Sequence, residues 1–327
     1  MSASRLDTQP PSRAGEFNYL SAETASSLFR NGEVLTRRDL DGSDGGVVGV
    51  YPRSYTVDVF DARGLIDGER KSCERNGFEL IDAHAPAVEF FDHDDVIRRY
   101  YPDCEALVAA STGGRAFAFD HNLRSAQGKA NSTRIAGGQT VQGPAKMVHG
   151  DYTLTSAPQR LQDLSRPPGQ NDTLRGVLGD RALISAQAAE TALAADGRFA
   201  IINVWRSIAA EPVQLNPLAM CDGQTVVPDD LVTFEIHYAD RIGENYFAKH
   251  APAHAFFFFP EMTRGEVLLL KQWDSAGPLA RSAGAVGDAS PDAPCTFSFH
   301  SAFDDPSVAD DAPDRLSIEV RCLVLYD

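Results

Sequence analysis

The sequence lacks long hydrophobic runs. A membrane-spanning helix needs about 20 consecutive apolar residues, whereas the run "AFFFF" at 255–259 has only five. The opening residues, "MSASRLDTQPPSRAGE", are polar and contain no apolar segment of the kind that a secretory signal carries. These absences predict a cytoplasmic protein.

Basic residues are also scarce relative to acidic ones. The 327 residues include 30 Lys and Arg against 46 Asp and Glu, which gives a formal net charge of −16. A protein that binds nucleic acid needs a basic face to meet the phosphates, and an anionic membrane surface likewise attracts basic proteins. The acidic balance therefore argues against both as partners.

Cysteines are few and widely spaced. There are five, and none forms a Cys-x-x-Cys pair: Cys73, Cys104, Cys221, Cys295 and Cys322. This spacing favours reduced, buried thiols over a disulfide framework or a zinc site.

Several common catalytic motifs are missing. The sequence contains no Gly-x-Gly-x-x-Gly or Walker-type loop, which argues against a nucleotide cofactor. It also contains no Gly-x-Ser-x-Gly elbow, which removes the most common hydrolase interpretation.

What the sequence does contain is a series of strand-like segments in its second half, at 198–208, 231–239, 244–260, 266–275, 295–303 and 315–327. Helix-like segments precede them at 93–112, with a break at Pro102, at 158–168 and at 179–196. Short-spaced strands flanked by helices predict a mainly β protein, a sandwich or a jelly roll wrapped by helices.

The domain organisation follows from composition. Residues 1–16 are rich in Ser, Pro, Arg and Gly, which predicts a flexible N-terminal tail. No repeat or linker divides the rest, so we expect residues 17–327 to form one domain with a helical and strand elaboration at its N-terminal side.

The segment "MVHGDYTLT" holds the first candidate for chemistry. His149 and Asp151 are two residues apart in a strand-like pattern, so their side chains point to the same side. Two imidazoles and one carboxylate on one face can hold Fe(II) and leave the opposite positions open. A surface pair without function is the competing interpretation, because about one His-x-Asp is expected by chance in such a chain.

A second His-x-Asp, at His93 and Asp95, tests how specific the pattern is. It lies at a predicted helix start, where side chains two residues apart diverge by about 200° and cannot share a metal. We interpret the acidic residues there as helix caps.

The third metal ligand has to come from another strand. In "CTFSFHSAF", His300 stands in a strand-like segment whose alternate positions are apolar. The following segment, "RLSIEVR", alternates a polar face with an apolar one. Such a polar face usually lies in solvent, but its combination with His300 favours a pocket lined by Arg315, Ser317, Glu319 and Arg321.

The remaining histidines are weaker candidates. His121 follows Asp120 and is expected to have a hydrogen-bonded structural role. His250 and His254 are four residues apart, which suits a metal site on a helix, but Pro252 between them argues against a helix.

Taken together, these segments resemble the non-heme-iron hydroxylase/desaturase family over roughly residues 45–327. The likeness rests on "NGFELIDAHAP" (76–86), "FAFDHNLR" (117–124), "VHGDYTLTSAPQR" (148–160), "INVWRSI" (202–208), "PLAMCD" (217–222), "KQWDS" (271–275), "FHSAFDDP" (299–306) and "RLSIEVR" (315–321). The resemblance implies a double-stranded β-helix, that is, a jelly roll. It also implies Fe(II), 2-oxoglutarate and dioxygen as cofactor and cosubstrates.

Carried over residue by residue, the resemblance assigns iron to His149, Asp151 and His300. It assigns the far carboxylate of 2-oxoglutarate to Arg315 with Ser317, and makes Arg321 the alternate anchor. Asn203, Trp205, Arg206 and Lys271 fall in family-like stretches without an assigned role.

The function implied is an oxygenase that hydroxylates or desaturates an unactivated carbon of a small secondary metabolite. Two alternatives remain open. One is a partner-dependent or non-catalytic subunit that binds a small molecule in a biosynthetic complex, and the other is a metal enzyme of the same fold without an oxo acid. A homo-oligomer or a companion biosynthetic enzyme is a further expectation.

Overall fold

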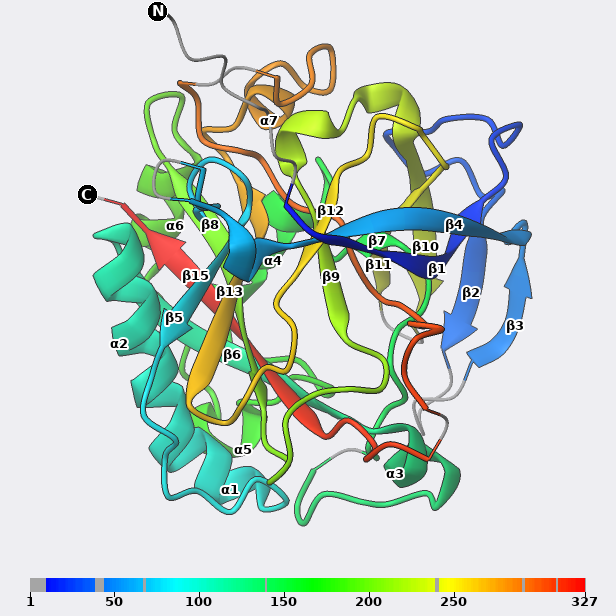
Figure 1. Cartoon of the computed structure of the whole chain (residues 1–327). Coiled ribbons are helices and arrows are strands. Elements are labelled where there is room, and N and C mark those ends of the chain that lie inside the picture. The colour runs from blue at the N-terminus through cyan, green and yellow to red at the C-terminus, as the bar shows by residue number, and fades with distance from the viewer. Residues whose placement is uncertain are drawn as a thin grey trace, which may run out of the picture.

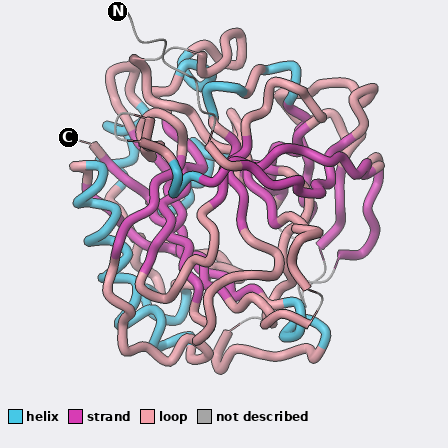
Figure 2. The backbone as a smooth tube through the Cα atoms, in the orientation of Figure 1, coloured by secondary structure: helices cyan, strands magenta, loops and turns pink. Residues whose placement is uncertain are grey.

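The computed structural model describes residues 10–38, 44–66, 69–138, 140–238, 241–289, 292–309 and 311–326. Strands predominate over helices throughout this part of the chain (Figures 1 and 2). They form a ten-stranded sheet and a five-stranded sheet.

The five-stranded sheet is antiparallel, in the order β5-β13-β8-β15-β6. All nine residues of its central strand β8 are buried, because β8 has neighbours on both sides and helix α2 packs against β6, β15 and β8. Figure 1 shows α2 along the outer side of this sheet. The strands are β5 (Phe78–Asp82), β6 (Arg115–Arg124), β8 (Phe199–Ser207), β13 (Glu266–Asp274) and β15 (Ser317–Leu325).

The ten-stranded sheet has the order β1-β4-β12-β9-β14-β7-β11-β10-β2-β3. Its pairs are antiparallel except for β12 with β4 and β10 with β2, which are parallel. The strands are β1 (Ser12–Leu20), β2 (Leu35–Arg38), β3 (Asp44–Val48), β4 (Pro52–Asp61), β7 (His149–Gly150), β9 (Leu218–Cys221), β10 (Leu231–His237), β11 (Ile242–Ala248), β12 (Phe256–Phe258) and β14 (His300–Ala302).

The two sheets face each other across the interior of the molecule. Asp151, directly after β7 of the larger sheet, makes hydrogen bonds to Asn203 on β8 and Gln272 on β13 of the smaller one. The predicted fold class, a mainly β jelly roll with flanking helices, is confirmed.

The helices are short and flank the sheets: α1 (His93–Asp95), α2 (Tyr101–Thr112), α3 (Ala126–Ala130), α4 (Ser156–Leu164), α5 (Arg175–Leu178), α6 (Ala186–Leu193) and α7 (Pro278–Arg281). A π-helical turn, η2 (Val96–Tyr100), joins α1 to α2, and 3-10 turns occur at η1 (Ala62–Gly64), η3 (Gly223–Thr225) and η4 (Pro228–Asp230). The predicted helix over 93–112 is therefore confirmed, but the break expected at Pro102 is wrong. The chain stays helical through this residue, because Pro102 lies in the first turn of α2, where its missing N–H costs nothing.

The predicted N-terminal tail is corrected in part. Residues 12–16, expected to be flexible, begin β1, which pairs with β4 from Ser12 opposite Phe60 onward. Gly15 allows close packing there, because a Cβ atom at this position would lie 2.7 Å from the ring of Phe303. Composition suggested a flexible segment, but cross-strand pairing orders it. Residues 1–9 lie outside the described residues.

Several elements also differ from prediction. The strand expected over 244–260 is two strands, β11 and β12, and of the strand-like segment around His149 only β7 is a strand. The helix expected over 179–196 is only α6, because Ser185 caps its start by accepting a hydrogen bond from the backbone of Ala188. The strand expected over 295–303 is only β14. Upstream of it, the backbone N–H groups of Cys295 and Ser298 donate to the carbonyls of Glu74 and of Lys271 on β13, and not to β7 or β9, the strands that pair with β14.

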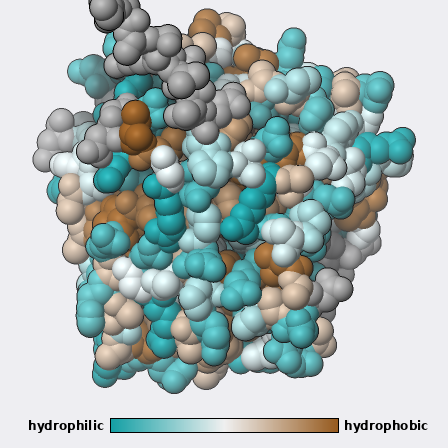
Figure 3. Space-filling model, viewed as in Figure 1, coloured by the Kyte–Doolittle hydropathy of each residue, from teal (hydrophilic) through white to brown (hydrophobic). Residues whose placement is uncertain are grey.

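On the face shown in Figure 3, hydrophobic residues form separate patches among hydrophilic ones. None of the helices in the described part of the chain is long and apolar enough to cross a membrane. The single-domain organisation of residues 17–327 stays a prediction.

Candidate metal and cosubstrate site

The three residues predicted as metal ligands lie together. His300 on β14 stands opposite His149 on β7 in the antiparallel register, and the ring centroids are 4.3 Å apart. Asp151 follows β7, and its Oδ1 lies 3.6 Å from Nε2 of His149 and 3.9 Å from Nε2 of His300. One ligand atom of each residue lies within 4.8 Å of the others.

Both imidazoles are held in the neutral form. Burial, and next the neighbouring His300, lower the pKa of His149 to about 4. Burial also lowers the pKa of His300, against the opposing effect of Asp151. Nδ1 of His149 lies 2.7 Å from the carbonyl oxygen of Met147, so Nδ1 carries the proton and Nε2 has a free lone pair.

Asp151 is a buried carboxylate that remains ionised. Burial alone would raise its pKa, but Arg321, His300 and His149 together hold the pKa well below its usual value. Its Oδ2 accepts hydrogen bonds from Asn203 Nδ2 at 3.0 Å and from Arg321 Nε at 3.4 Å. Oδ1 therefore remains the oxygen that faces the two imidazoles.

Arg321 is fully engaged by protein carboxylates. Its three nitrogens lie 3.4 Å from Asp151, 2.9 Å from Asp120 and 3.1 Å from Glu319. These carboxylates outweigh the effect of burial and raise the pKa of Arg321. The polar face of β15 thus lines the interior, but Arg321 has no nitrogen that is not already paired with a carboxylate.

Arg315 has a different environment. It is only 2% exposed, its Nη1 donates to the carbonyl of Asn216 at 2.5 Å, and its Nε has no hydrogen-bond partner. No carboxylate of the described residues lies within ion-pair distance of it. Burial, and next Arg124, lower its pKa from the usual 12.5 to about 9, with Asp314 and Glu319 opposing this only in part. Arg315 is therefore a buried positive charge without an ion-pair partner among the described carboxylates.

Two serines flank the same region. Ser317 on β15 stands directly opposite Ser207 on β8, and the hydroxyl of each is buried without a hydrogen-bond partner. Sequence reasoning selected Ser317 but missed Ser207. The signal was the alternation of Asn203, Trp205 and Ser207, which puts all three on the inner face of β8.

The other histidines have structural partners. His93 lies at the start of α1, where the side chain of Asp92 accepts from the backbone of Asp95, so the predicted capping is confirmed. His121 Nδ1 lies 2.9 Å from the hydroxyl of Tyr101. His254 lies 3.1 Å from Asp230 and 3.2 Å from the hydroxyl of Tyr19, and neither His250 nor His254 lies in a helix.

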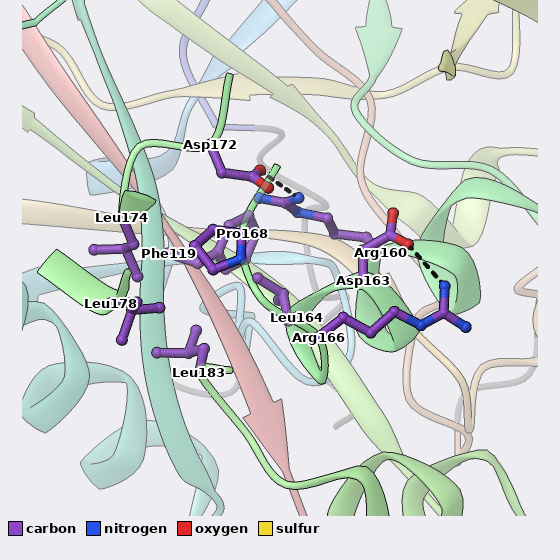
Figure 4. A pocket seen from close by; sticks show the side chains of 10 residues that line it. All are labelled: Phe119, Arg160, Asp163, Leu164, Arg166, Pro168, Asp172, Leu174, Leu178 and Leu183. Carbon is purple, nitrogen blue, oxygen red and sulfur yellow. Dashed lines mark hydrogen bonds and ion pairs between the residues drawn. The ribbon is translucent and has the colours of Figure 1, made fainter. Parts of the chain in front are cut away.

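A separate hollow lies between α4, α5 and β6 (Figure 4). Its charged side chain Arg160 pairs with Asp172 at 2.8 Å and lies 4.9 Å from the ring centroid of Phe119. None of the triad residues lines it, and both of its arginines are already paired, since Arg166 lies 3.9 Å from Asp163. The arrangement that can carry chemistry is therefore the triad together with the unpartnered polar groups of Arg315, Ser317 and Ser207.

Comparison with known proteins gives a family match over nearly the whole chain. Residues 18–325 match the family model described as "Oxidoreductase/YMDC permease-like domain". The chain is 40% identical over 197 residues to an uncharacterized protein in the dcmA 3' region of Methylophilus leisingeri, covering 59% of this chain and 89% of that protein.

Two fungal relatives carry functional names. The Fe(II)/2-oxoglutarate-dependent dioxygenase nvfI of Aspergillus novofumigatus is 31% identical over 281 residues, which cover 83% of each chain. The hydroxylase/desaturase efuI of Hormonema carpetanum is 27% identical over 86% of this chain and 88% of its own. A solved structure of the iron and alpha-ketoglutarate-dependent endoperoxidase NvfI matches with a TM-score of 0.68 at 23% identity, over 95% of this chain and 97% of that one.

Proposed function

This chain belongs to the family of Fe(II)/2-oxoglutarate-dependent dioxygenases, and from that premise we propose that it hydroxylates or desaturates an unactivated carbon of a small secondary metabolite. Fe(II), 2-oxoglutarate and dioxygen are the cofactor and cosubstrates of this family. The names of the relatives support the enzyme and not the alternative of a non-catalytic subunit.

The donor set of the triad fits Fe(II). Two neutral imidazoles and one ionised carboxylate suit a divalent non-heme iron and leave its other positions open. In the proposed site, Nε2 of His149, Nε2 of His300 and Oδ1 of Asp151 hold the metal. Bound Fe(II) supplies the means to activate dioxygen at the expense of 2-oxoglutarate.

The polar groups of Arg315, Ser317 and Ser207 fit the far carboxylate of 2-oxoglutarate. A buried arginine without a counter-ion, beside two buried hydroxyls without partners, is a costly arrangement unless an anion completes it. The planar guanidinium matches a carboxylate. We assign the anchor to Arg315 with Ser317, add Ser207 opposite it, and do not assign it to Arg321, whose nitrogens are paired with carboxylates.

The protein residues have three tasks in this proposal. The triad side chains present unprotonated ligand atoms, Arg315 orients the cosubstrate by its far end, and the apolar interior excludes water from the reacting atoms. The burial of Arg315 with an unpartnered Nε and no described carboxylate within ion-pair distance is the observation that carries the cosubstrate assignment.

A direct test is cosubstrate turnover. Purified protein with Fe(II) and 2-oxoglutarate is expected to release succinate, slowly even without a substrate. An enzyme of the same fold that uses no oxo acid would bind metal and release none. If the protein neither binds metal nor releases iron-dependent succinate, the proposed function is wrong.

Three further expectations belong to the same proposal, and they concern the domain organisation, the location and the partners. A family match that begins at residue 18 and ends at 325 supports one domain over 17–327. The five cysteines are buried and unpaired, which supports a cytoplasmic location. A homo-oligomer or a companion enzyme stays a prediction.

A further inference from the structure

Two stretches of the sequence, "INVWRSI" and "KQWDS", contain polar residues that the proposed function does not use. They lie on the neighbouring strands β8 and β13, where Asn203 stands opposite Leu270. The pairing shifts between Lys271 and Trp273, so Gln272 is the extra residue of a β-bulge. Bulges redirect side chains and are frequent beside active sites.

The bulge directs Gln272 towards Asp151. Oε1 of Gln272 accepts a hydrogen bond from the backbone N–H of Asp151 at 3.0 Å. Asn203, from the adjacent strand, donates to Oδ2 of Asp151 at 3.0 Å. The smaller sheet thus holds both the backbone and the side chain of a residue that follows β7 of the larger sheet.

These contacts distinguish the two oxygens of the carboxylate. Oδ2 is held by Asn203 and Arg321, whereas Oδ1 faces the two imidazoles. A carboxylate without these donors could rotate about its Cβ–Cγ bond and exchange its oxygens, so the amide of Asn203 selects which one faces the metal.

A purely structural role explains the two amides poorly. Asn203 and Gln272 are both 0% exposed, yet Oδ1 of Asn203 and Nε2 of Gln272 have no hydrogen-bond partner. A buried polar atom without a partner costs about 1–3 kcal/mol, roughly what one hydrogen bond contributes or more. Each residue therefore adds little or nothing to the stability of the fold, although each contacts the proposed iron ligand.

We infer that Asn203 and Gln272 are positioning residues that fix Asp151 with Oδ1 towards the metal. This inference rests on the proposed function, because it requires that Asp151 binds iron. Partners of this kind around a metal ligand typically contribute 10- to 100-fold in metal affinity.

The test measures binding of Co(II), a spectroscopic substitute for Fe(II), to the full chain. Asn203→Leu and Gln272→Met remove the hydrogen bonds at nearly constant volume. Each is expected to weaken Co(II) binding about 10- to 100-fold and to change the d–d absorption spectrum, which reports ligand geometry. The free energy of unfolding of the metal-free variants, measured in urea, is expected to equal or exceed that of the wild type.

Gln224→Met is a matched control. Nε2 of Gln224 is also buried without a partner, but Gln224 lies in η3 and its backbone bonds to Asp222. This control is expected to bind Co(II) as the wild type does. Gln272→Asn keeps an amide but shortens the side chain, so the amide oxygen no longer reaches the backbone N–H of Asp151 and no apolar surface is added. This variant is expected to show the same loss of Co(II) affinity even if an apolar variant fails to fold.

The outcomes separate the two proposals. Wild-type affinity and an unchanged spectrum in folded Asn203 and Gln272 variants would overturn the positioning role and leave the proposed function intact. A wild-type protein that binds no metal would overturn the proposed function, and the positioning role with it.

Discussion

Replacement of Arg315 by methionine is expected to stabilise the protein and to abolish cosubstrate binding. Burial lowers the pKa of Arg315 from 12.5 to about 9. Each unit corresponds to about 1.4 kcal/mol, so burying the charge costs up to about 5 kcal/mol. Both pKa values lie above neutral pH, so the full cost is present at pH 7 and falls only as the pH rises above 9.

The net gain is expected to be smaller than this limit. Methionine loses the hydrogen bond from Nη1 to the carbonyl of Asn216 and part of the contact with the Trp205 ring, whose centroid lies 5.7 Å from Cζ. Replacing buried charges by apolar residues of similar volume has stabilised other proteins by about 1–4 kcal/mol. We expect a gain in that range for the free energy of unfolding of Arg315→Met.

The assay is urea unfolding with and without 2-oxoglutarate, with the same divalent metal present throughout. At 100 times its dissociation constant, the cosubstrate is expected to stabilise the wild type by about 2.7 kcal/mol and to leave Arg315→Met unchanged. Equal stabilisation of the two proteins by 2-oxoglutarate would refute the assignment of the anchor.

Arg206→Met is the matched control for this experiment. Arg206 is also 2% exposed, but its Nε donates to the hydroxyl of Tyr100 and its Nη1 to backbone carbonyls, including that of Ala83. Its removal leaves buried acceptors without donors. We therefore expect Arg206→Met to be less stable than the wild type, with an unchanged gain from 2-oxoglutarate.

Three further predictions follow from the same geometry. His300→Ala is expected to lower the metal content after dialysis at least tenfold. Substitution of the exposed His84 is the control and should leave the metal content unchanged. Equal metal contents in the two variants would contradict the assignment of the three ligands. Gly150→Ala places a Cβ atom 3.0 Å from the ring of Phe297, so we expect the free energy of unfolding, measured in urea, to fall by about 1–3 kcal/mol. Gly176→Ala is the control, because its Cβ atom meets no atom within 4 Å, and it should not show this loss. Burial lowers the pKa of His121 from 6.5 to about 4, so the ring is buried in its neutral form. The contribution of this neutral ring to the free energy of unfolding is complete above pH 6.5 and declines as the pH falls towards 4. Between pH 7.5 and 5 the free energy of unfolding of the wild type should fall by about 2 kcal/mol relative to that of His121→Gln. An equal difference between the two proteins at both pH values would disprove this.

The sequence selects three candidate metal ligands that the structure brings together, because the relevant patterns are local. His149 and Asp151 are two residues apart, and His300 lies in a segment with a clear alternation of apolar residues. Strand geometry determines which side chains of a strand share a face. The inward direction of Ser207 follows from the same rule, although the sequence alone gives no reason to select it. Because β7 is only His149–Gly150, the position of Asp151 beside His149 also depends on its hydrogen bonds to Asn203 and Gln272.

The sequence does not predict features that depend on pairing between distant segments. The bulge at Gln272 exists only because β13 pairs with β8 out of simple register, and β1 is ordered only because it pairs with β4. Local composition suggested the opposite for residues 12–16. Neither partner strand is adjacent in the sequence to the segment that it orders.

The two arginines of the last strand region show this limit most clearly. Arg315 and Arg321 stand six residues apart on the same polar face, and the sequence offers both as anchors for one carboxylate. Their difference comes from other strands: Asp120 on β6 and Asp151 after β7 pair with Arg321, and no described carboxylate reaches Arg315.

An arginine surrounded by carboxylates can hold a protein group in place, but it has little left to offer a ligand. An arginine that is buried without a counter-ion destabilises the fold until an anion arrives, and that deficit becomes available as binding free energy. The proposed assignment of a positioning role to Arg321 and of cosubstrate binding to Arg315 therefore rests on charge compensation, which depends on the tertiary structure and not on the motif.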